Sequence, residues 1–344
     1  MPIFKGLGRA PAPSRRTLLW SLVLLAVIAS AVIWRLRQTT PAAGAHAVLV
    51  VGDQKGGAQA LLMAAGELEH VPYEIKWALF PAASPLLEAL DAGAVDIGGV
   101  GGAPFAFAYA SGAKIKVIAA YRPPPEAVGK ASAIIVAKGS QIRTLADLKG
   151  KKLATIKGSA GQDLALKLLE KAGLKANDVQ WVYLANGEAK AALATGAIDA
   201  WSTWGSYVGI AVIEDGDRML ADGSGVASGE IFFAAGDAAI DGKKAQLADF
   251  VARLTRARAW GRKHQDDYAR TLSAETGIPF KVARFGTAAA LGPTVPINAA
   301  LVAEQGAIFQ RYKAAGVIPE IPNIEGGYLA TYDVVALPKP SDKD

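Results

Sequence analysis

Cysteine is absent from this chain of 344 residues, and histidine occurs only at His46, His70 and His264. Without cysteine there is no disulfide framework, no nucleophilic thiol and no lipid-modified cysteine to tether an exported protein. The three histidines lie far apart in the sequence, which argues against a Ser-His-Asp set and against a histidine-based metal site. We therefore expect no catalytic residues, no metal and no cofactor, with each histidine at the surface.

Phosphate-binding glycine motifs are also missing, and the N-terminal segment 1–47, called the leader below, has no acidic residue. No Gly-Lys-Ser or Gly-Lys-Thr follows a glycine-rich loop, and no Gly-x-Gly-x-x-Gly is followed by an acid, so a nucleotide site is not expected. Residues 1–47 hold six basic residues and no acid, while the other 297 residues balance 31 basic against 31 acidic ones. The basic excess belongs to the leader, and the remainder has no electrostatic footprint for nucleic acid.

The leader is expected to enter a membrane. Thr17–Trp34 is an uncharged, mostly apolar run of 18 residues with four basic residues before it and two after it. This charge asymmetry, with a twin-arginine pattern over 14–19, keeps the N-terminus inside and sends the rest outward. We predict a periplasmic or extracytoplasmic location. A retained inner-membrane anchor at 17–34 is favoured, and cleavage of a signal peptide at 45–47 remains open.

Two stretches of the chain repeat one another. Leu90–Asp96 and Leu193–Asp199 both read Leu-x-x-Gly-Ala-(Val or Ile)-Asp, where the glycine ends a helical pattern and a strand pattern follows. The strands then run into glycines over 97–104 and into aromatic residues over 200–207, which resembles the open end of an α/β sheet where ligands bind. The repeat predicts two similar lobes around a cleft, although helix–glycine–strand joints recur in any α/β protein.

Folding is expected to start at Val48, after a linker of small residues over 38–47. Strand and helix patterns alternate, which predicts mostly parallel sheets, and one long helical pattern covers 244–272. We interpret one unit as inserted into the other. The predicted parts are a leader and linker at 1–47, a first lobe from 48–132 and 234–344, and a second lobe from 133–233, joined by two crossing segments.

Two predicted strand-to-helix loops are suited to hold an anion. Ser159, Ala160 and Gly161 open a helix, where backbone N–H groups point out of the helix start; an ordinary serine cap without a ligand is the alternative. Gly101 and Gly102 precede a second helix start, at which glycine lets a ligand approach the backbone.

Polar and aromatic residues near the same predicted cleft supply further candidates. Gln54 and Lys55 end the first strand, and the alternative for them is a solvated loop. Trp201, Trp204 and Tyr207 stand three residues apart, as on one face of a helix; we assign Trp204 and Tyr207 to the ligand and leave Trp201 to the core.

Charged residues elsewhere receive structural interpretations. Asp96 and Asp199 begin strands at equivalent places, which indicates capping rather than acid–base chemistry. The arginines spaced along the long helical pattern are interpreted as a solvated helix face: Arg253, Arg256, Arg258 and Arg262.

Short patterns along residues 48–320 match one family in order and spacing. They lie in Gly52–Gly56, Leu86–Leu90 through Gly93 and Asp96, Gly101–Pro104, Leu145–Lys152, Lys157–Ser159, Gly196–Trp201 with Trp204, and Phe232–Phe233. In these residues the chain resembles the periplasmic solute-binding proteins of ABC importers of the aliphatic sulfonate, taurine and nitrate group. The resemblance implies the α/β type II periplasmic binding protein fold, with two lobes, each a mostly parallel sheet flanked by helices, that close on a small anion.

Carried over residue by residue, the resemblance assigns ligand binding to Gln54, Gly101, Gly102, Ser159, Ala160, Gly161, Trp204 and Glu230. Three positions depart from the usual family pattern. Asp53 stands in place of tyrosine, Gly205-Ser206 in place of Asp-Pro, and no arginine follows the paired phenylalanines. An added acid and a missing cation near the cleft weaken the case for a sulfonate in particular.

Together these patterns predict a non-enzymatic, monomeric binding protein. It captures a small organic, anionic, aliphatic-sulfonate-like solute in the cleft and delivers it to the permease and ATPase of an ABC importer, with no nucleic-acid partner. The alternatives are a membrane-anchored sensor or accessory ectodomain of the same fold, and a binding protein for nitrate or for a thiamine precursor.

Overall fold

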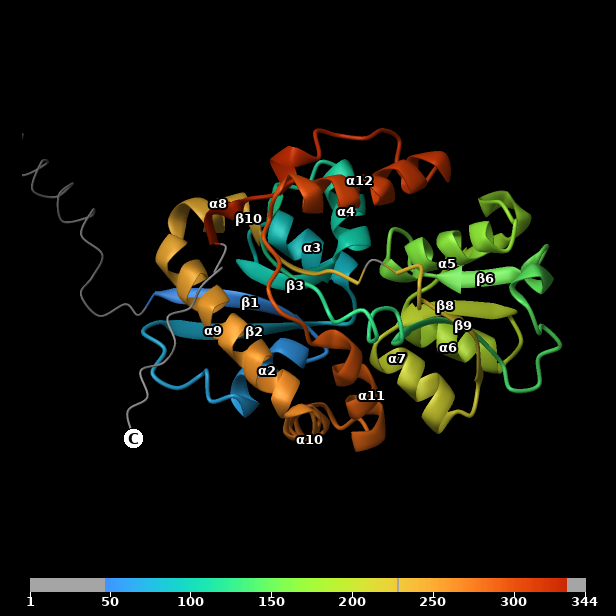
Figure 1. Cartoon of the computed structure of the whole chain (residues 1–344), viewed down its shortest axis with the longest axis horizontal. Helices are drawn as coiled ribbons and strands as arrows, with labels where there is room; N and C mark the ends of the chain where they lie inside the picture. Colours follow the sequence, from blue (N-terminus) through green and yellow to red (C-terminus); the bar gives the residue numbers. More distant parts are fainter. Residues whose placement is uncertain (1–46, 228, 333–344) are drawn as a thin grey trace, which may run out of the picture. The chain divides into compact units, whose positions relative to one another are not determined.

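Two sheets, each flanked by helices, form the part of the chain that the computed structural model describes, residues 47–227 and 229–332 (Figure 1). The predicted apolar run Thr17–Trp34 lies outside these residues. None of the helices in the described part combines the length and the apolar character that a membrane span requires.

The first sheet has the strand order β2-β1-β3-β10-β4. Strands β2, β1 and β3 are parallel neighbours, whereas β10 runs antiparallel to both β3 and β4. Runs rich in valine, isoleucine and aromatic residues favour these extended segments. The strands are β1 (Val48–Gln54), β2 (Glu74–Phe80), β3 (Ile97–Gly101), β4 (Ile115–Tyr121) and β10 (Ile231–Gly236).

The second sheet repeats this topology with the order β7-β6-β8-β5-β9. Here β5 is the reversed strand and pairs antiparallel with β8 and β9, while β6 is parallel to β7 and β8. In both sheets the reversed strand is the first strand after the chain crosses from the other sheet. It runs antiparallel to both of its neighbours. The strands are β5 (Ser132–Val136), β6 (Lys152–Thr155), β7 (Gln180–Tyr183), β8 (Ala200–Trp204) and β9 (Arg218–Asp222).

The sequence repeat occupies equivalent places in the two sheets. Asp96 pairs with Val50 of β1 through its backbone N–H, which donates to the Val50 carbonyl (2.9 Å), and through its Oδ2, which accepts from the Val50 N–H (2.7 Å). Asp199 pairs with Lys152 of β6 in the same way, at 3.0 and 2.8 Å. Each carboxylate therefore accepts a hydrogen bond from an N–H of the adjacent internal strand, which confirms the predicted capping role.

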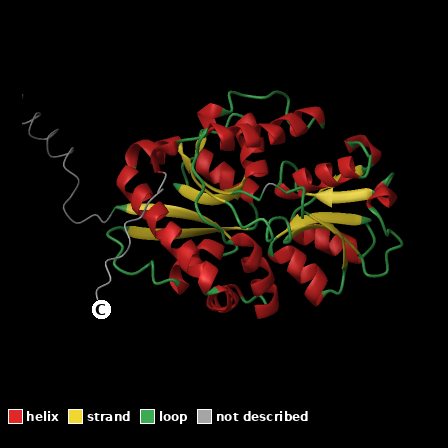
Figure 2. Cartoon of the chain, viewed as in Figure 1, coloured by secondary structure: helices red, strands yellow, loops and turns green. Residues whose placement is uncertain are grey.

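Helices cover both faces of each sheet, as Figure 2 shows. Apolar side chains of α2, α9 and α10 pack on one face of the first sheet, and those of α3 and α4 pack on the other. In the second sheet α5 covers one face and α6 the other. The helices are α2 (Gly57–Ala64), α3 (Ala83–Asp91), α4 (Gly102–Ala110), α5 (Ala160–Lys171), α6 (Asn186–Ala194), α9 (Lys244–Lys263) and α10 (Gln265–Thr276).

The long helical pattern predicted over 244–272 is two helices rather than one. At His264 the backbone leaves the helical region (φ −125°, ψ 46°), and this residue both ends α9 and precedes α10. The sequence patterns also gave no sign of β9, α7 (Ser206–Gly209), α8 (Asp237–Gly242) or α11 (Phe280–Ala290). Apart from α11, these elements have six residues or fewer, and short elements depend on tertiary packing more than on local preference.

Two crossing segments and one helix connect the two sheets. The first crossing covers 122–131, and the second runs from Gly223 to Glu230, of which Ser228 lies outside the described residues. The segments touch where the Gly223 N–H donates to the Gly129 carbonyl (3.0 Å). Helix α12 (Ala299–Ala314) packs buried side chains against both α4 and α5.

Candidate functional site

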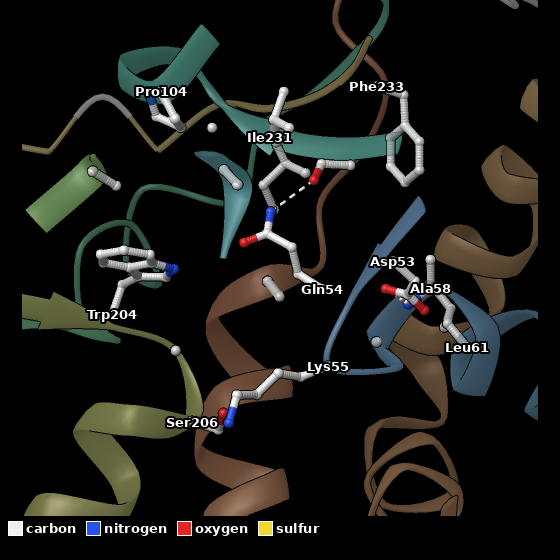
Figure 3. A pocket seen from close by; sticks show the side chains of 18 of the residues that line it. Asp53, Gln54, Lys55, Ala58, Leu61, Pro104, Trp204, Ser206, Ile231 and Phe233 are labelled. Carbon is white, nitrogen blue, oxygen red and sulfur yellow. Dashed lines mark hydrogen bonds between the residues drawn. The ribbon is translucent and has the colours of Figure 1, made fainter. Parts of the chain in front are cut away.

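A cavity of about 340 Å³ is lined by the ends of strands from both sheets and by the helices that follow them (Figure 3). In Figure 3, Trp204 and Pro104 lie on one side of this cavity, and Ala58, Leu61 and Phe233 lie on the other. The structure brings most of the predicted ligand residues to its wall. These are Gln54, Lys55, Gly101, Ser159, Ala160, Trp204 and Tyr207.

The other three predicted residues lie differently. Gly102 and Glu230 line a second cavity of about 230 Å³, which shares Gly101, Ala160 and Trp204 with the first. Gly161 lines neither cavity, because it packs against β8. A Cβ at Gly161 would lie 2.6 Å from the Ser202 carbonyl oxygen, so glycine lets the start of α5 approach the strand.

No carboxylate caps the start of α4 or α5, and Asp163 in the first turn of α5 is paired with Lys167 and Arg311. The Ser159 hydroxyl caps α5 by accepting a hydrogen bond from the Gln162 N–H (3.2 Å), and the α4 cap, Gly101, has no side chain. Within the described residues, the N–H groups of Ala160 and Gly102 have no hydrogen-bond acceptor. Unpaired N–H groups at a helix start attract anions.

The start of α2 differs, because Asp53 caps it. Its carboxylate accepts hydrogen bonds from the N–H groups of Ala58 (3.1 Å) and Gln59 (2.8 Å), and Figure 3 shows it turned toward Ala58. Asp53 is 4% exposed, and this burial raises its pKa from 3.8 to about 6, although the backbone hydrogen bonds oppose the shift. The departure from the family pattern at Asp53 therefore provides an internal anion for one helix start.

Asp53 is expected to make the native state less stable as the pH rises from about 4 to about 6. In this window the folded carboxyl still holds its proton while the unfolded one has lost it, so the native state binds more protons. Stability falls by about 3 kcal/mol at most and levels off above the folded pKa. Denaturant unfolding of the protein and of Asp53→Asn across this pH range checks the prediction. The free energy of unfolding should fall with rising pH in the protein but not in the variant. The same pH dependence in both would contradict the prediction.

Gln54, Lys55 and Tyr207 are held in the cavity wall by specific contacts. The Gln54 Nε2 donates to the Gly99 carbonyl (2.8 Å), as the dashed line in Figure 3 marks. The Lys55 ammonium lies 4.1 Å from the centroid of the Tyr207 ring, and the Tyr207 hydroxyl donates to the Pro81 carbonyl (3.4 Å). Because Lys55 follows β1 and Tyr207 follows β8, these contacts join the two sheets across the cavity.

Trp201 and Trp204 belong to β8, so the predicted helix face is wrong. Strand β8 pairs with β5 and β6, and this pairing over long sequence distances overrides the three-residue spacing. Side chains three residues apart on a strand point to opposite faces. Trp201 is accordingly buried in the core (1% exposed), as expected, while Trp204 at the strand end lines both cavities.

Glu230 belongs to an ion-pair network between the crossing segments. Its Oε1 accepts a hydrogen bond from the Arg122 Nε (2.8 Å), and its Oε2 accepts one from the Gln305 Nε2 (3.3 Å). Arg122 also pairs with Glu304. Because protein groups donate to both oxygens of the Glu230 carboxylate, Glu230 has a structural role at the crossing segments although it lines the second cavity.

Replacing Glu230 with alanine is expected to lower the free energy of unfolding by about 2 kcal/mol, since it leaves Gln305 and Arg122 without their buried acceptor. Glu304→Ala is the matched control. It removes the other carboxylate from Arg122, but the Glu304 side chain is 52% exposed against 2% for Glu230. Its cost should stay below about 1 kcal/mol. Equal losses in denaturant unfolding would contradict this account.

Arg258 was missed by the sequence interpretation. It lines the first cavity and is only 5% exposed, so its assignment to a solvated helix face is wrong. The available signal is helical periodicity, because Arg258 continues the buried positions Leu247, Val251 and Leu254 of α9. Arg253 and Arg256 of the same helix pair with the acids Asp249 and Glu67.

The described residues contain no group of three or more acidic or histidine side chains that could hold a metal ion. Two lobes of one topology, with a cavity between their strand ends, define a solute-binding protein of the type II periplasmic binding fold. The chain belongs to the family described as NMT1/THI5 like, which matches residues 79–268. The fold class and the family resemblance predicted from the sequence are confirmed.

Relatives of known name agree with this assignment. The putative aliphatic sulfonates-binding protein of Escherichia coli (strain K12) is 35% identical over 237 residues, 68% of this chain and 73% of that protein. The alkanesulfonate-binding protein SsuA from Xanthomonas axonopodis pv. citri, bound to MOPS, has a TM-score of 0.74 at 31% identity. The match covers 83% of this chain and 99% of that SsuA chain. The periplasmic aliphatic sulphonate binding protein SsuA from Escherichia coli has a TM-score of 0.71 at 31% identity. That match covers 86% of this chain and 98% of the SsuA chain. The chain is therefore an extracytoplasmic solute-binding protein of the ABC-importer class and not an enzyme.

Proposed function

We propose that the solute is a small alkanesulfonate, bound between the starts of α4 and α5 and against the indole of Trp204. The observation that carries the proposal is the contrast between the start of α2 and the starts of α4 and α5. Asp53 already caps α2, whereas the N–H groups of Gly102 and Ala160 have no described acceptor. A sulfonate offers three acceptor oxygens and one negative charge, which suits such donors.

The remaining residues receive supporting roles in this proposal. Gln54, Lys55, Gly101, Ser159 and Tyr207 line the cavity and contact the solute. Gly161 and Glu230 act indirectly, by seating α5 on β8 and by bracing the crossing segments. We retain the predicted lobe boundaries, 48–132 with 234–344 and 133–233, and propose that the lobes close by rotation about the two crossings. Closure would bring Trp204 onto the solute.

A thermal-shift screen of the full chain tests the solute class, because a ligand that binds only the native state raises its melting temperature. The panel holds alkanesulfonates, taurine, sulfate esters, nitrate, thiamine precursors and the carboxylates of matched chain length. The proposal expects alkanesulfonates to stabilise the protein more than their carboxylate counterparts. Stabilisation by nitrate or a thiamine precursor, without any by sulfonates, would overturn it.

We also propose that the protein is a monomer, delivers its solute to the permease and ATPase of an importer, and is tethered to the inner membrane by residues 17–34. The apolar run and its flanking charges support the tether. Mass spectrometry of the mature N-terminus tests it. An N-terminus upstream of residue 17 in the membrane fraction is expected, and cleavage at 45–47 would make the protein a free shuttle.

A further inference from the structure

Arg258 places a buried cation in the wall of the first cavity without a protein counter-ion. Its Nη2 donates to the Ala290 carbonyl (2.6 Å), and its guanidinium carbon lies 4.4 Å from the centroid of the Tyr121 ring. Its Nε is buried with no hydrogen-bond partner in the described part of the chain. These contacts orient the guanidinium but leave part of its donor capacity unused.

No carboxylate among the described residues lies within ion-pair distance of Arg258, whereas its neighbours Arg253 and Arg256 each have one. Asp53 lines the same cavity, but its oxygens accept from the start of α2 and form no ion pair with Arg258. Burial and the nearby charge of Arg262 lower the pKa of Arg258. A buried charge of this kind is costly unless an anion accompanies it.

Aromatic and apolar residues surround the Arg258 guanidinium in the wall of the first cavity. Its stacking partner Tyr121 packs edge-on against Phe233, at 6.1 Å between ring centroids, and Leu254 lies one turn before it on α9. Figure 3 shows Phe233 on the side of the cavity opposite Trp204 and Pro104. The first cavity is thus lined both by Ala160, which opens α5, and by a guanidinium that stacks on an aromatic ring packed against Phe233.

We propose that Arg258 binds a second anionic group of the solute, a carboxylate, so that the preferred ligands are short sulfocarboxylates with an acid at each end. This inference rests on the proposed function and refines it. Arginine suits a carboxylate because its planar fork matches the two oxygens, and an apolar environment strengthens the attraction.

Isothermal titration of the full chain with sulfopropionate and with its neutral amide, sulfopropionamide, isolates the charge at the far end of the ligand. The protein is expected to bind the carboxylate about 30-fold more tightly than the amide. Arg258→Met should reduce this ratio to within about threefold, whereas Arg258→Lys, which keeps a cation, should retain part of it. Arg256→Met, which removes an arginine already paired with Glu67, is the control and should keep the full ratio.

The outcomes separate this inference from the proposed function. If the amide binds as tightly as the carboxylate, Arg258 does not select a second anion, while sulfonate binding stands. If neither compound nor any other sulfonate binds, the proposed function itself fails. A ratio that survives in Arg258→Met also overturns the inference. Should that variant not fold, Arg258→Gln, which can still donate to the Ala290 carbonyl, takes its place.

Discussion

Replacing Gly158 with alanine is expected to weaken sulfonate binding by more than about 100-fold and to lower the free energy of unfolding by about 3 kcal/mol. Gly158 has a φ of +70°, and a Cβ there would lie 2.2 Å from the Cγ and 2.7 Å from the Cβ of Phe107. The Phe107 Cβ cannot rotate away, so α4 must move from the loop that opens α5. That movement separates the two helix starts that are proposed to share the anion.

Gly173→Ala is the matched control for this change. Gly173 follows the other end of α5 with nearly the same φ, +74°, but a Cβ there would meet nothing within 4 Å. It should therefore cost about 1 kcal/mol of stability, from backbone strain alone, and leave affinity intact. Isothermal titration and denaturant unfolding of both variants measure the difference. Equal affinities in Gly158→Ala and the unchanged protein would show that the helix starts do not bind the solute together.

Replacing Trp204 with alanine is expected to weaken sulfonate binding by about 30-fold to 100-fold, since the indole is the largest apolar surface proposed to cover the solute. Trp204 ends β8 and is only half-buried, so the loss of stability should be small beside the loss of affinity. Trp204→Phe, which keeps a ring at the same place, should recover much of the binding.

Trp260→Ala serves as the control for general effects of losing a tryptophan. Trp260 stacks on His264 (4.6 Å between ring centroids) and lines neither of the two cavities. It should lower stability while the dissociation constant stays within about twofold. If both alanine variants bind the sulfonate as the unchanged protein does, Trp204 is not part of the binding site.

Local sequence patterns were enough to predict the repeated core of each lobe. A left-handed glycine and the aspartate three residues later sit at the same place in both sheets, as Gly93 with Asp96 and Gly196 with Asp199. This was predictable because a helix stop followed by a strand start is decided within a few residues. The loops at Gly101 and Ser159 were identified for the same reason, since each joins a strand directly to a helix.

Long-range partners explain what the sequence could not predict. Trp201 and Trp204 have helical spacing, yet their strand is set by pairing with β5 and β6, which lie some distance along the chain. Glu230 pairs with Arg122, which is 108 residues earlier. The residues next to Glu230 in the sequence do not distinguish a carboxylate that binds a ligand from one that stabilises a crossing segment.

On α9 the charge pattern and the apolar periodicity predict different orientations for Arg258, and the structure agrees with the apolar periodicity. The basic residues of this helix suggest one exposed face, but the apolar residues at three- and four-residue intervals turn Arg258 inward. Asp53 shows the same limit. The sequence predicts that this acid opposes an anionic ligand, yet in the structure its carboxylate accepts hydrogen bonds from the start of α2.

The central claim is that a sulfonate lies between the starts of α4 and α5, against Trp204. Crystals grown with an alkanesulfonate and measured for anomalous scattering from sulfur test it most directly, because the chain has no cysteine and three methionines, and the ligand sulfur therefore stands out. The account predicts an anomalous peak beside Ala160 and Gly102, where the 340 Å³ cavity adjoins the second cavity. A sulfonate peak away from these two helix starts, or one at the start of α2 beside Asp53, would contradict it.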